Sequence, residues 1–364
     1  MRKYFLLVVL GLFTIISLTT LRSIVPDLLY KQALSFALAF LVFFLAWKTP
    51  FTFHLQMSKW LYLLLNLLLL FLLIYGSVTR GISAWLVLPF GFKFQPSQLA
   101  VPVVALYLLN FFRSEKQFTW FLLLKTLLIV ALPSVLILAQ PDFGTALVFM
   151  AAMAIFLFFN RLNLKQSFAL LTLILVGVLF LWTLVFKDYQ KNRLLGFLHL
   201  YQTQTVVQSG AQESSSAYNA RQALIAVGSG QFWGRGLGQG VQSHLRFLPE
   251  RQTDFIFASF SEEWGFVGAF FLLALYFVLL AYLFYFAIKA EDFGQKLYLL
   301  VLFMMFLTQI LINIGMNLAI LPITGITLPF LSYGGSSVIS LFFALGVAQS
   351  IIASLKKKAI HSFY

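Results

Sequence analysis

Long apolar runs without charged residues constrain the fold of this chain more than any other feature of its sequence. The stretches Trp60 to Val78, Gly265 to Ile288 and Val301 to Ile320 meet or approach the ~20 residues that an α-helix needs to span the hydrocarbon of a bilayer. Charged residues make up only 10% of the 364 residues, too few to cover the surface of a water-soluble fold of this length. The sequence therefore predicts an all-α, polytopic membrane protein.

Ten segments have the length and hydropathy of membrane-spanning helices. We expect these helices near residues 4–22, 28–47, 60–78, 97–112, 118–139, 143–159, 166–186, 255–288, 297–318 and 336–355. Lys and Arg are enriched in short cytoplasmic loops. With the N-terminus inside, the inner loops and tails hold thirteen of them, against four in the short outer loops. The sequence thus predicts a plasma-membrane protein with both termini in the cytoplasm, one integral membrane domain over residues 1–364, and a large extracytoplasmic loop, about 187–254, between helices 7 and 8.

Composition excludes several classes of function. The chain has no cysteine, which rules out thiolate chemistry and zinc sites that use Cys ligands. The net charge of +14 is high enough to suggest nucleic-acid binding. The basic residues, however, lie at the ends of the expected helices and not on one face, so we expect membrane lipid and no nucleic acid as a partner.

The topology places four irregular segments on the outer side of the membrane. They are Arg80 to Ser97, Gln140 to Gly144, the long loop, and Leu321 to Ser337. Non-helical backbone near membrane depth is tolerated only where protein buries it or where it lines a cavity. The sequence therefore predicts a cavity that opens outward.

Asp254 stands where the polar loop becomes the eighth membrane helix. The residues that share one face of this helix, at helical spacing, are Asp254, Ala258, Ser261, Glu262 and Gly265. An acid near mid-membrane is too costly to face lipid, so we expect this face to line a polar cavity. The alternative is that Asp254 caps the helix, and the two roles are compatible.

Four arginines precede or flank this helix entrance, namely Arg221, Arg235, Arg246 and Arg251. Guanidinium groups bind phosphate through paired hydrogen bonds, so arginines at the outer surface suit a lipid phosphate or pyrophosphate. Ordinary interfacial placement of a long basic side chain is the alternative.

Two further segments are rich in small residues. The tract Gly228 to Gly240 has neither the preceding strand nor the Gly-Lys-Ser/Thr of a nucleotide-binding loop, which favours close backbone packing. The segment Ser332 to Ser337 is a turn before the last helix, and its backbone N–H groups are candidates for anion binding. A simple re-entrant turn explains it equally well.

Taken together, these segments resemble the SEDS (shape, elongation, division and sporulation) family, and most closely its rod-shape branch. The matching motifs, in family order, are Gln95–Ser97, Gln140–Ala146, Ile225–Gly230, Leu248–Ala258 followed by Glu262 and Glu263, Asn313–Met316 and Pro329–Ser337. The motifs cover residues 80–350 and are highly specific as a set. The sequence departs from the family pattern at Gln98 and Val101, which replace the usual Glu and Lys, and at Gln252, which replaces the usual His.

The resemblance implies a peptidoglycan glycosyltransferase that polymerises lipid II at the outer face of the membrane for cell elongation. It implies a class B penicillin-binding protein, a transpeptidase, as the partner, and it maps the essential acid of the family onto Asp254. The expected substrate-binding residues are Arg221, Gln222, Arg251, Glu250, Asp142, Glu262, Gln98, Ser332 and Ser336. Charge on the leaving group would be met by Arg221 and Arg251 or by a divalent cation, Mg²⁺ or Mn²⁺. A flippase of the lipid-linked precursor and a non-catalytic scaffold for the transpeptidase remain alternatives.

Overall fold

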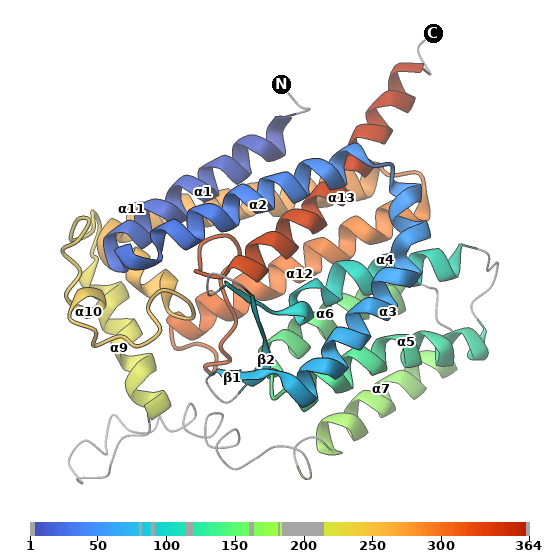
Figure 1. Ribbon diagram of the computed structural model, residues 1–364, viewed down its shortest axis with the longest axis horizontal. Helices are drawn as coiled ribbons and strands as arrows, with labels where there is room; N and C mark the ends of the chain where they lie inside the picture. Colours follow the sequence, from blue (N-terminus) through green and yellow to red (C-terminus); the bar gives the residue numbers. More distant parts are fainter. Residues whose placement is uncertain are drawn as a thin grey trace. The chain divides into compact units, whose positions relative to one another are not determined.

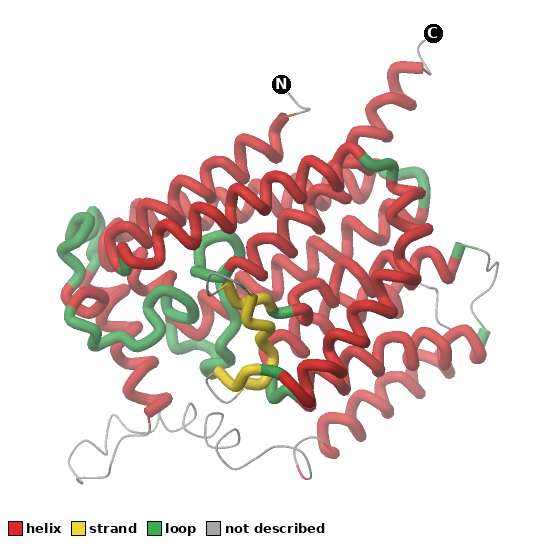
Figure 2. Tube along the Cα trace, viewed as in Figure 1, coloured by secondary structure: helices red, strands yellow, loops and turns green. Residues whose placement is uncertain are grey.

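A computed structural model of the chain describes residues 4–79, 82–88, 92–113, 119–159, 164–180, 183 and 215–361. Helices form most of this described part, together with one small sheet and several loops (Figures 1 and 2). Contacts between residues divide the chain into two compact units. The first unit comprises Met1–Asn160, Leu272–Ile310 and Pro329–Tyr364, and the second comprises Arg161–Phe271 and Leu311–Leu328.

The first unit is a helical bundle with a short sheet. Its complete helices are α1 (Phe5–Ile24), α2 (Leu29–Lys48), α3 (Phe51–Tyr75), α4 (Ala100–Phe112), α5 (Trp120–Ala139), α6 (Phe143–Phe159) and α13 (Gly335–His361). The second part of α11 (Ile256–Lys289) and most of α12 (Phe293–Asn317) also belong to it. Helices α2 and α13 pack side by side along their length (Figure 1).

Helix α1 shows how these helices divide their surface. Leu6, Leu10 and Phe13 recur at helical spacing and are buried against the bundle, whereas Val8 and Ile15 on the opposite face are exposed. Both faces are apolar. A helix that is apolar all round, with one face packed and the other bare, is typical of a bundle whose solvent is lipid.

Each of the ten expected membrane spans overlaps a helix in the described part of the chain, and the multi-pass helical class is confirmed. Seven helices in the described part of the chain are long and apolar enough to cross a membrane, and Pro96–Phe112 and Phe143–Leu157 are shorter apolar helices. The predicted bounds of the third span, 60–78, are wrong. Helix α3 begins at Phe51, because the polar His54 of its first turns is buried and bonded to Thr49 and to the carbonyl of Ala46, and it ends before Gly76.

A three-stranded antiparallel sheet occupies part of the segment that was expected to be irregular. Strand β1 (Ser77–Thr79) pairs with β2 (Ile82–Leu88), which pairs with β3 (Phe92–Phe94), in the order β1-β2-β3 (Figure 2). Val87 lies opposite Lys93 in this register. Pairing the strands satisfies backbone N–H and C=O groups that would otherwise be costly to bury.

The second unit contains the described part of the long loop. Its elements are α7 (Leu164–Phe180), α9 (Ser215–Ser229), α10 (Val241–His244), the first part of α11, the end of α12 and the segment 318–328. The segment that was expected to be one long loop therefore includes a helix of 15 residues and a short helical turn. Residues 187–214 of that loop, and residues 181, 182 and 184–186 of the expected seventh span, lie outside the described residues.

Helix α11 is broken at Gly265, whose φ of 66° and ψ of −165° are accessible only to glycine. The backbone groups released by the break bond to the glycine-rich segment 230–240. The bonds are Phe266 N to Gln231 O (2.8 Å), Val267 N to Phe232 O (3.2 Å), Arg235 N to Glu262 O (3.0 Å) and Gly236 N to Glu263 O (3.0 Å). The glycine-rich segment thus supplies hydrogen-bond partners to the backbone at the helix break. This confirms the expectation of close backbone packing.

Candidate functional site

Asp254 lies in a tight turn just before α11. The turn begins at Glu250, which has a φ of 52°, and the carbonyl of Glu250 accepts hydrogen bonds from Thr253 N (3.0 Å) and Phe255 N (3.3 Å). The Glu250 carboxylate also accepts a bond from the Thr253 hydroxyl (3.2 Å). Glu250, expected to bind substrate, therefore shapes the turn that carries Asp254.

Two buried asparagines of α12 hold the backbone of Asp254. Asn313 and Asn317, one helical turn apart and each fully buried, both donate from Nδ2 to the carbonyl of Asp254 at 3.0 Å. Asn317 Oδ1 also accepts from the amide of Ala258 in the first turn of α11 (3.0 Å). A side chain from another helix thus supplies a cap to α11 and places Asp254 at a defined position.

The side chain of Asp254 is partly exposed and lies beside the segment that follows α12. A Cβ atom placed on Gly325 would lie 3.5 Å from Asp254 Oδ2. Gly325 is itself exposed and has a φ of 75°. Asn313 Nδ2 bonds the carbonyl of Ile326 at 2.7 Å, which fixes this segment and Asp254 to the same side chain. The Asp254 carboxylate therefore lies next to an exposed glycine.

A small apolar cluster brings α9 to the start of α11. The residues in it are Ala223, Ala226, Leu248, Phe255 and Ala258, with Val227 and Ile323 packed against them. Arg221 and Gln222 lie on the same helix, α9, with Arg221 exposed and Gln222 partly buried. Residues separated by about 100 positions in the chain therefore surround the segment that carries Asp254.

Arg251 is anchored three residues before Asp254. Its Nη1 donates a short hydrogen bond to the carbonyl of Ser243. Burial lowers the pKa of the Arg251 guanidinium from its ordinary value, and the positive charge of the nearby Arg246 lowers it further. Arginine remains protonated at neutral pH. A partly dehydrated cation beside a second cation gains stability from a bound anion, as the phosphate-binding hypothesis requires.

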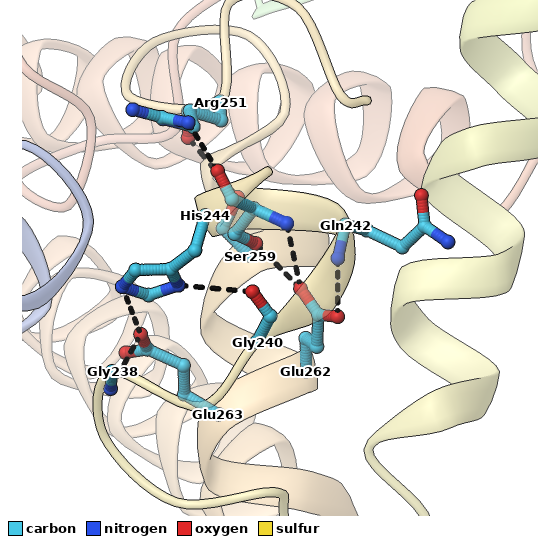
Figure 3. A network of polar contacts seen from close by, with 9 residues as sticks. Gly238, Gly240, Gln242, His244, Arg251, Ser259, Glu262 and Glu263 are labelled. Carbon is cyan, nitrogen blue, oxygen red and sulfur yellow. Dashed lines mark hydrogen bonds and ion pairs between the residues drawn. The ribbon is translucent and has the colours of Figure 1, made fainter. Parts of the chain in front are cut away.

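Glu262 lies deeper on α11 and is fully buried. Its carboxylate accepts hydrogen bonds from Gln242 N (2.8 Å), Ser243 N (3.0 Å) and the Ser243 hydroxyl (2.6 Å) (Figure 3). The Ser229 hydroxyl lies 3.5 Å from the same carboxylate. The structure thus places this expected substrate-binding residue against protein donors, at the centre of a polar network.

Glu263 is the second buried acid of this network. Its Oε1 accepts from Gly238 N at 3.2 Å and lies 3.9 Å from His244 Nε2 (Figure 3). His244 Nδ1 lies 3.0 Å from the carbonyl of Gly240. The adjacent acids Glu262 and Glu263 therefore bind different stretches of the loop that follows α9.

Gln98 and Asp142 form a separate polar group within the first unit. Asp142 caps α6, because its Oδ1 accepts from Thr145 N (3.1 Å), and its Oδ2 accepts from Gln95 Nε2 (2.6 Å). Gln98 Nε2 lies 3.3 Å from Gln95 Oε1 and 3.4 Å from the Thr145 hydroxyl. Burial raises the pKa of Asp142, although these hydrogen bonds oppose the shift.

Ser332 is buried in the turn before α13 and Ser336 is buried in the first turn of α13, and both belong to the first unit. Gln32 of α2 binds this turn twice, donating to the carbonyl of Ser332 (3.4 Å) and accepting from the amide of Gly334 (3.3 Å). The turn is therefore anchored on α2. The predicted residues thus fall into a group around Asp254 in the second unit and two groups in the first.

Sequence reasoning missed Asn317, Ser243 and Gly325. Asn317 carried a signal, since with Asn313 it forms an i, i+4 pair of amides in an otherwise apolar helix, and polar residues in such helices mark functional or packing sites. Ser243 and Gly325 carried none, because their importance depends on partners distant in the chain.

No cluster of three or more His, Asp or Glu side chains suited to a metal ion occurs among the described residues. The acids nearest in sequence to Asp254 are Glu250, which bonds within its own turn, and Glu262, which is enclosed by donors. The protein groups around Asp254 therefore do not fit a metal site made of protein ligands alone.

Comparison with known proteins identifies the family. The model of the family of FtsW, RodA and SpoVE, described as cell cycle proteins, matches residues 1–357. The peptidoglycan glycosyltransferase MrdB of Escherichia coli K12 is 33% identical over 302 residues, which cover 81% of this chain and 77% of that protein. A probable peptidoglycan glycosyltransferase FtsW of Acinetobacter baylyi is 31% identical over 333 residues, 90% of this chain and 80% of that protein.

Solved structures agree with the sequence comparison. A chain from a study of how a peptidoglycan synthase complex coordinates polymerization and crosslinking is 28% identical, with a TM-score of 0.79, and 96% of this chain and 97% of that chain are covered. The crystal structure of the rod shape determining protein RodA of Thermus thermophilus is 26% identical, with a TM-score of 0.71 and 96% of both chains covered. The chain therefore belongs to the FtsW/RodA/SpoVE family of cell cycle proteins.

Proposed function

We propose that this protein is a peptidoglycan glycosyltransferase that polymerises lipid II at the outer face of the plasma membrane. The relatives that carry this activity in their names support the proposal over most of their length. The observation that carries it is the arrangement of Asp254, whose backbone is held by two buried amides while its partly exposed carboxylate lies beside Gly325.

Asp254 acts as the general base in this proposal. It takes the proton of the sugar 4-hydroxyl of one substrate, whose oxygen forms a bond to the anomeric carbon of the other. The bond between that carbon and the phosphate oxygen breaks, and polyprenyl pyrophosphate leaves with the electron pair. The configuration at the anomeric carbon is inverted. A positioned base of this kind typically contributes about 10²–10⁴-fold to the rate.

Arg251 meets the charge of the departing pyrophosphate, with Arg221 of α9 as a second candidate. Arg251 is suited to this role because it is protonated, partly dehydrated and beside a second cation, Arg246. A divalent cation, if bound, would add Lewis-acid stabilisation of the pyrophosphate. Since the protein lacks a preformed set of three acidic or His ligands in its described part, such an ion would depend largely on the oxygens of the substrate.

The proposal also includes the membrane topology, the partner protein and the cellular role. Both termini lie in the cytoplasm, which puts the long loop and Asp254 outside. A class B penicillin-binding protein is the partner, and the similarity to a chain of a synthase complex that coordinates polymerization and crosslinking supports this assignment. The segment Gln242–Arg251 resembles the rod-shape branch of the family more than its division branch. This resemblance favours a role in cell elongation over one in cell division.

The test is polymerisation of lipid II by the purified protein with its co-occurring transpeptidase, comparing the parent with Asp254→Asn. We expect the variant to fold normally and to lose at least about 10²-fold in rate, because an amide cannot accept the proton. Asp292→Asn is a matched control, since Asp292 caps α12 by bonding Gln295 N and should be dispensable for the reaction.

Parent-like polymer formation by Asp254→Asn would remove Asp254 as the base. A parent protein that forms no polymer but moves lipid II across vesicle membranes would indicate a flippase. A protein that does neither, but is required for crosslinking by the transpeptidase, would indicate a scaffold.

A further inference from the structure

Glu262 is a buried acid whose carboxylate is directed at one short stretch of the loop after α9. Both of its oxygens are engaged, Oε1 by Gln242 N and Oε2 by the amide and hydroxyl of Ser243. A buried carboxylate is costly unless donors compensate for the lost hydration. Gln242 and Ser243 are therefore held firmly to α11.

The fit between Glu262 and this stretch leaves no spare space. A Cβ atom at Gly240 would lie 2.7 Å from Glu262 Oε2 and 3.0 Å from its Cδ, closer than real Cβ atoms approach such atoms or at the limit of that approach. Ser243 is itself fully buried. The position of Ser243 is consequently set by the carboxylate of Glu262.

Ser243 joins Glu262 to Arg251. Its amide and hydroxyl bond Glu262, and its carbonyl accepts the hydrogen bond from Arg251 Nη1 (Figure 3). The carbonyl of Arg251 in turn lies 3.4 Å from the hydroxyl of Ser259 on α11. Arg251 is thus anchored to α11 directly through its backbone and, through Ser243, by its guanidinium.

We propose that Glu262 is a positioning residue that orients the Arg251 guanidinium, through Ser243, toward the pyrophosphate of the substrate. This inference rests on the function proposed above and assigns to Glu262 no contact with the substrate. A guanidinium has five N–H donors in a rigid plane, so one bond to Ser243 fixes its orientation and leaves donors for paired phosphate oxygens. Glu262 acts only through Arg251.

The test is a double-substitution cycle on Glu262 and Arg251, with kcat and KM for lipid II measured on the purified protein and its transpeptidase. In R251Q, loss of the charge that meets the leaving group should lower kcat by roughly 10²-fold. In E262Q the new side-chain NH₂ faces the N–H and O–H donors that the carboxylate accepted from, so Ser243 should shift. Because Ser243 orients Arg251, kcat should fall by about tenfold. The double variant should then be no slower than R251Q alone, because two groups that act in series are not independent.

Glu263→Gln is the matched control. Glu263 is the adjacent residue and also buried, and its carboxylate bonds Gly238 and lies near His244. Any fold-loss in kcat that Glu263→Gln causes should multiply with that of R251Q in the double variant. The control thus separates a general weakening of the loop from an effect transmitted to Arg251, which thermal unfolding alone would not do.

Ser243→Ala provides a second, milder variant in case E262Q does not fold. It removes the 2.6 Å bond from the Ser243 hydroxyl to Glu262 and keeps the backbone bonds. We expect a roughly threefold lower kcat, again with no further loss in the R251Q background.

The inference would be overturned if the fold-loss in kcat caused by E262Q, or by S243A where E262Q does not fold, multiplied with that of R251Q in the double variant. Parent-like kcat in folded E262Q, or in R251Q, would overturn it as well. Asp254→Asn measured in the same series distinguishes this inference from the proposed function. If the parent forms no polymer, the proposed function fails, and if that variant polymerises lipid II normally, only the assignment of Asp254 as the base fails. If it is inactive while the cycle is multiplicative, only the role of Glu262 fails.

Discussion

Asp254 and Glu262 lie on the same helix entrance, two helical turns apart, yet the structure uses them in opposite ways. Asp254 is held through its backbone carbonyl by two asparagines, and its side chain is partly exposed beside Gly325. Glu262 is fully buried, and its carboxylate itself makes the bonds that hold the loop. The structure thus bonds Asp254 to α12 through its backbone carbonyl, and it bonds Glu262 to the loop after α9 through its carboxylate.

The largest expected effect is on stability, at Gly265, the helix break that follows Glu262 on α11. Gly265→Ala places a Cβ atom 2.2 Å from Gly234 N, at a φ of 66°. We expect the free energy of unfolding to fall by about 4 kcal/mol or more, measured by thermal unfolding in detergent. Gly228→Ala is the control, because no atom lies within 4 Å of its added Cβ, and it should leave stability unchanged or slightly raised. Equal stability of both variants would show that the break at Gly265 is not required.

A change at Asp254 should lower the turnover rate much more than the stability of the protein. Asp254→Glu keeps the charge but moves the carboxylate by roughly one bond length, and a displacement of about 1 Å lowers turnover by up to about 10²-fold. The bonds from the two asparagines go to the backbone of Asp254 and are kept in this variant, so we expect turnover to fall far more than the unfolding temperature. Parent-like kcat in the lipid II assay would mean that the position of this carboxylate is not critical.

Asn317→Ala tests the backbone support of Asp254. It removes the acceptor of Ala258 N and one donor to the carbonyl of Asp254. We expect a loss of about 1–3 kcal/mol in the free energy of unfolding, together with a roughly tenfold lower kcat. Gln309→Met, at another buried polar position of α12, should leave kcat unchanged. If both variants lower kcat equally, Asn317 has no specific role near Asp254.

The smallest effect is expected at Gln98 in the first unit. Its contacts with Gln95 and Thr145 are long, at 3.3 and 3.4 Å, and Asp142 keeps its own bonds without it. Gln98→Ala should cost about 1 kcal/mol or less in the free energy of unfolding and change kcat by less than about threefold. A larger loss of kcat would place Gln98 in contact with the substrate.

Much of the fold was predictable because hydropathy is a local property. Ten apolar segments predicted ten helices, and the errors fell where polar residues were paired within the protein, as at His54 in the first turns of α3. The position of Asp254 at the start of α11 was predicted as well. The sheet of residues 77–94 and the helix α9 were not, since strands of three and seven residues offer few positions for a periodic pattern and α9 lies within a long polar segment that indicated a loop.

The sequence by itself determined the membrane class, the helical segments and the place of Asp254 at the entrance of α11, because each depends on residues that are neighbours along the chain. The tertiary structure decided how the acids are used. Glu262 and Asp254 share a predicted face, but the donors that enclose Glu262 come from Gln242 and Ser243, and the amides that hold Asp254 come from α12. Hydrogen bonds between segments about 20 to 60 residues apart leave no periodic trace in the sequence, since they depend on how the chain returns upon itself.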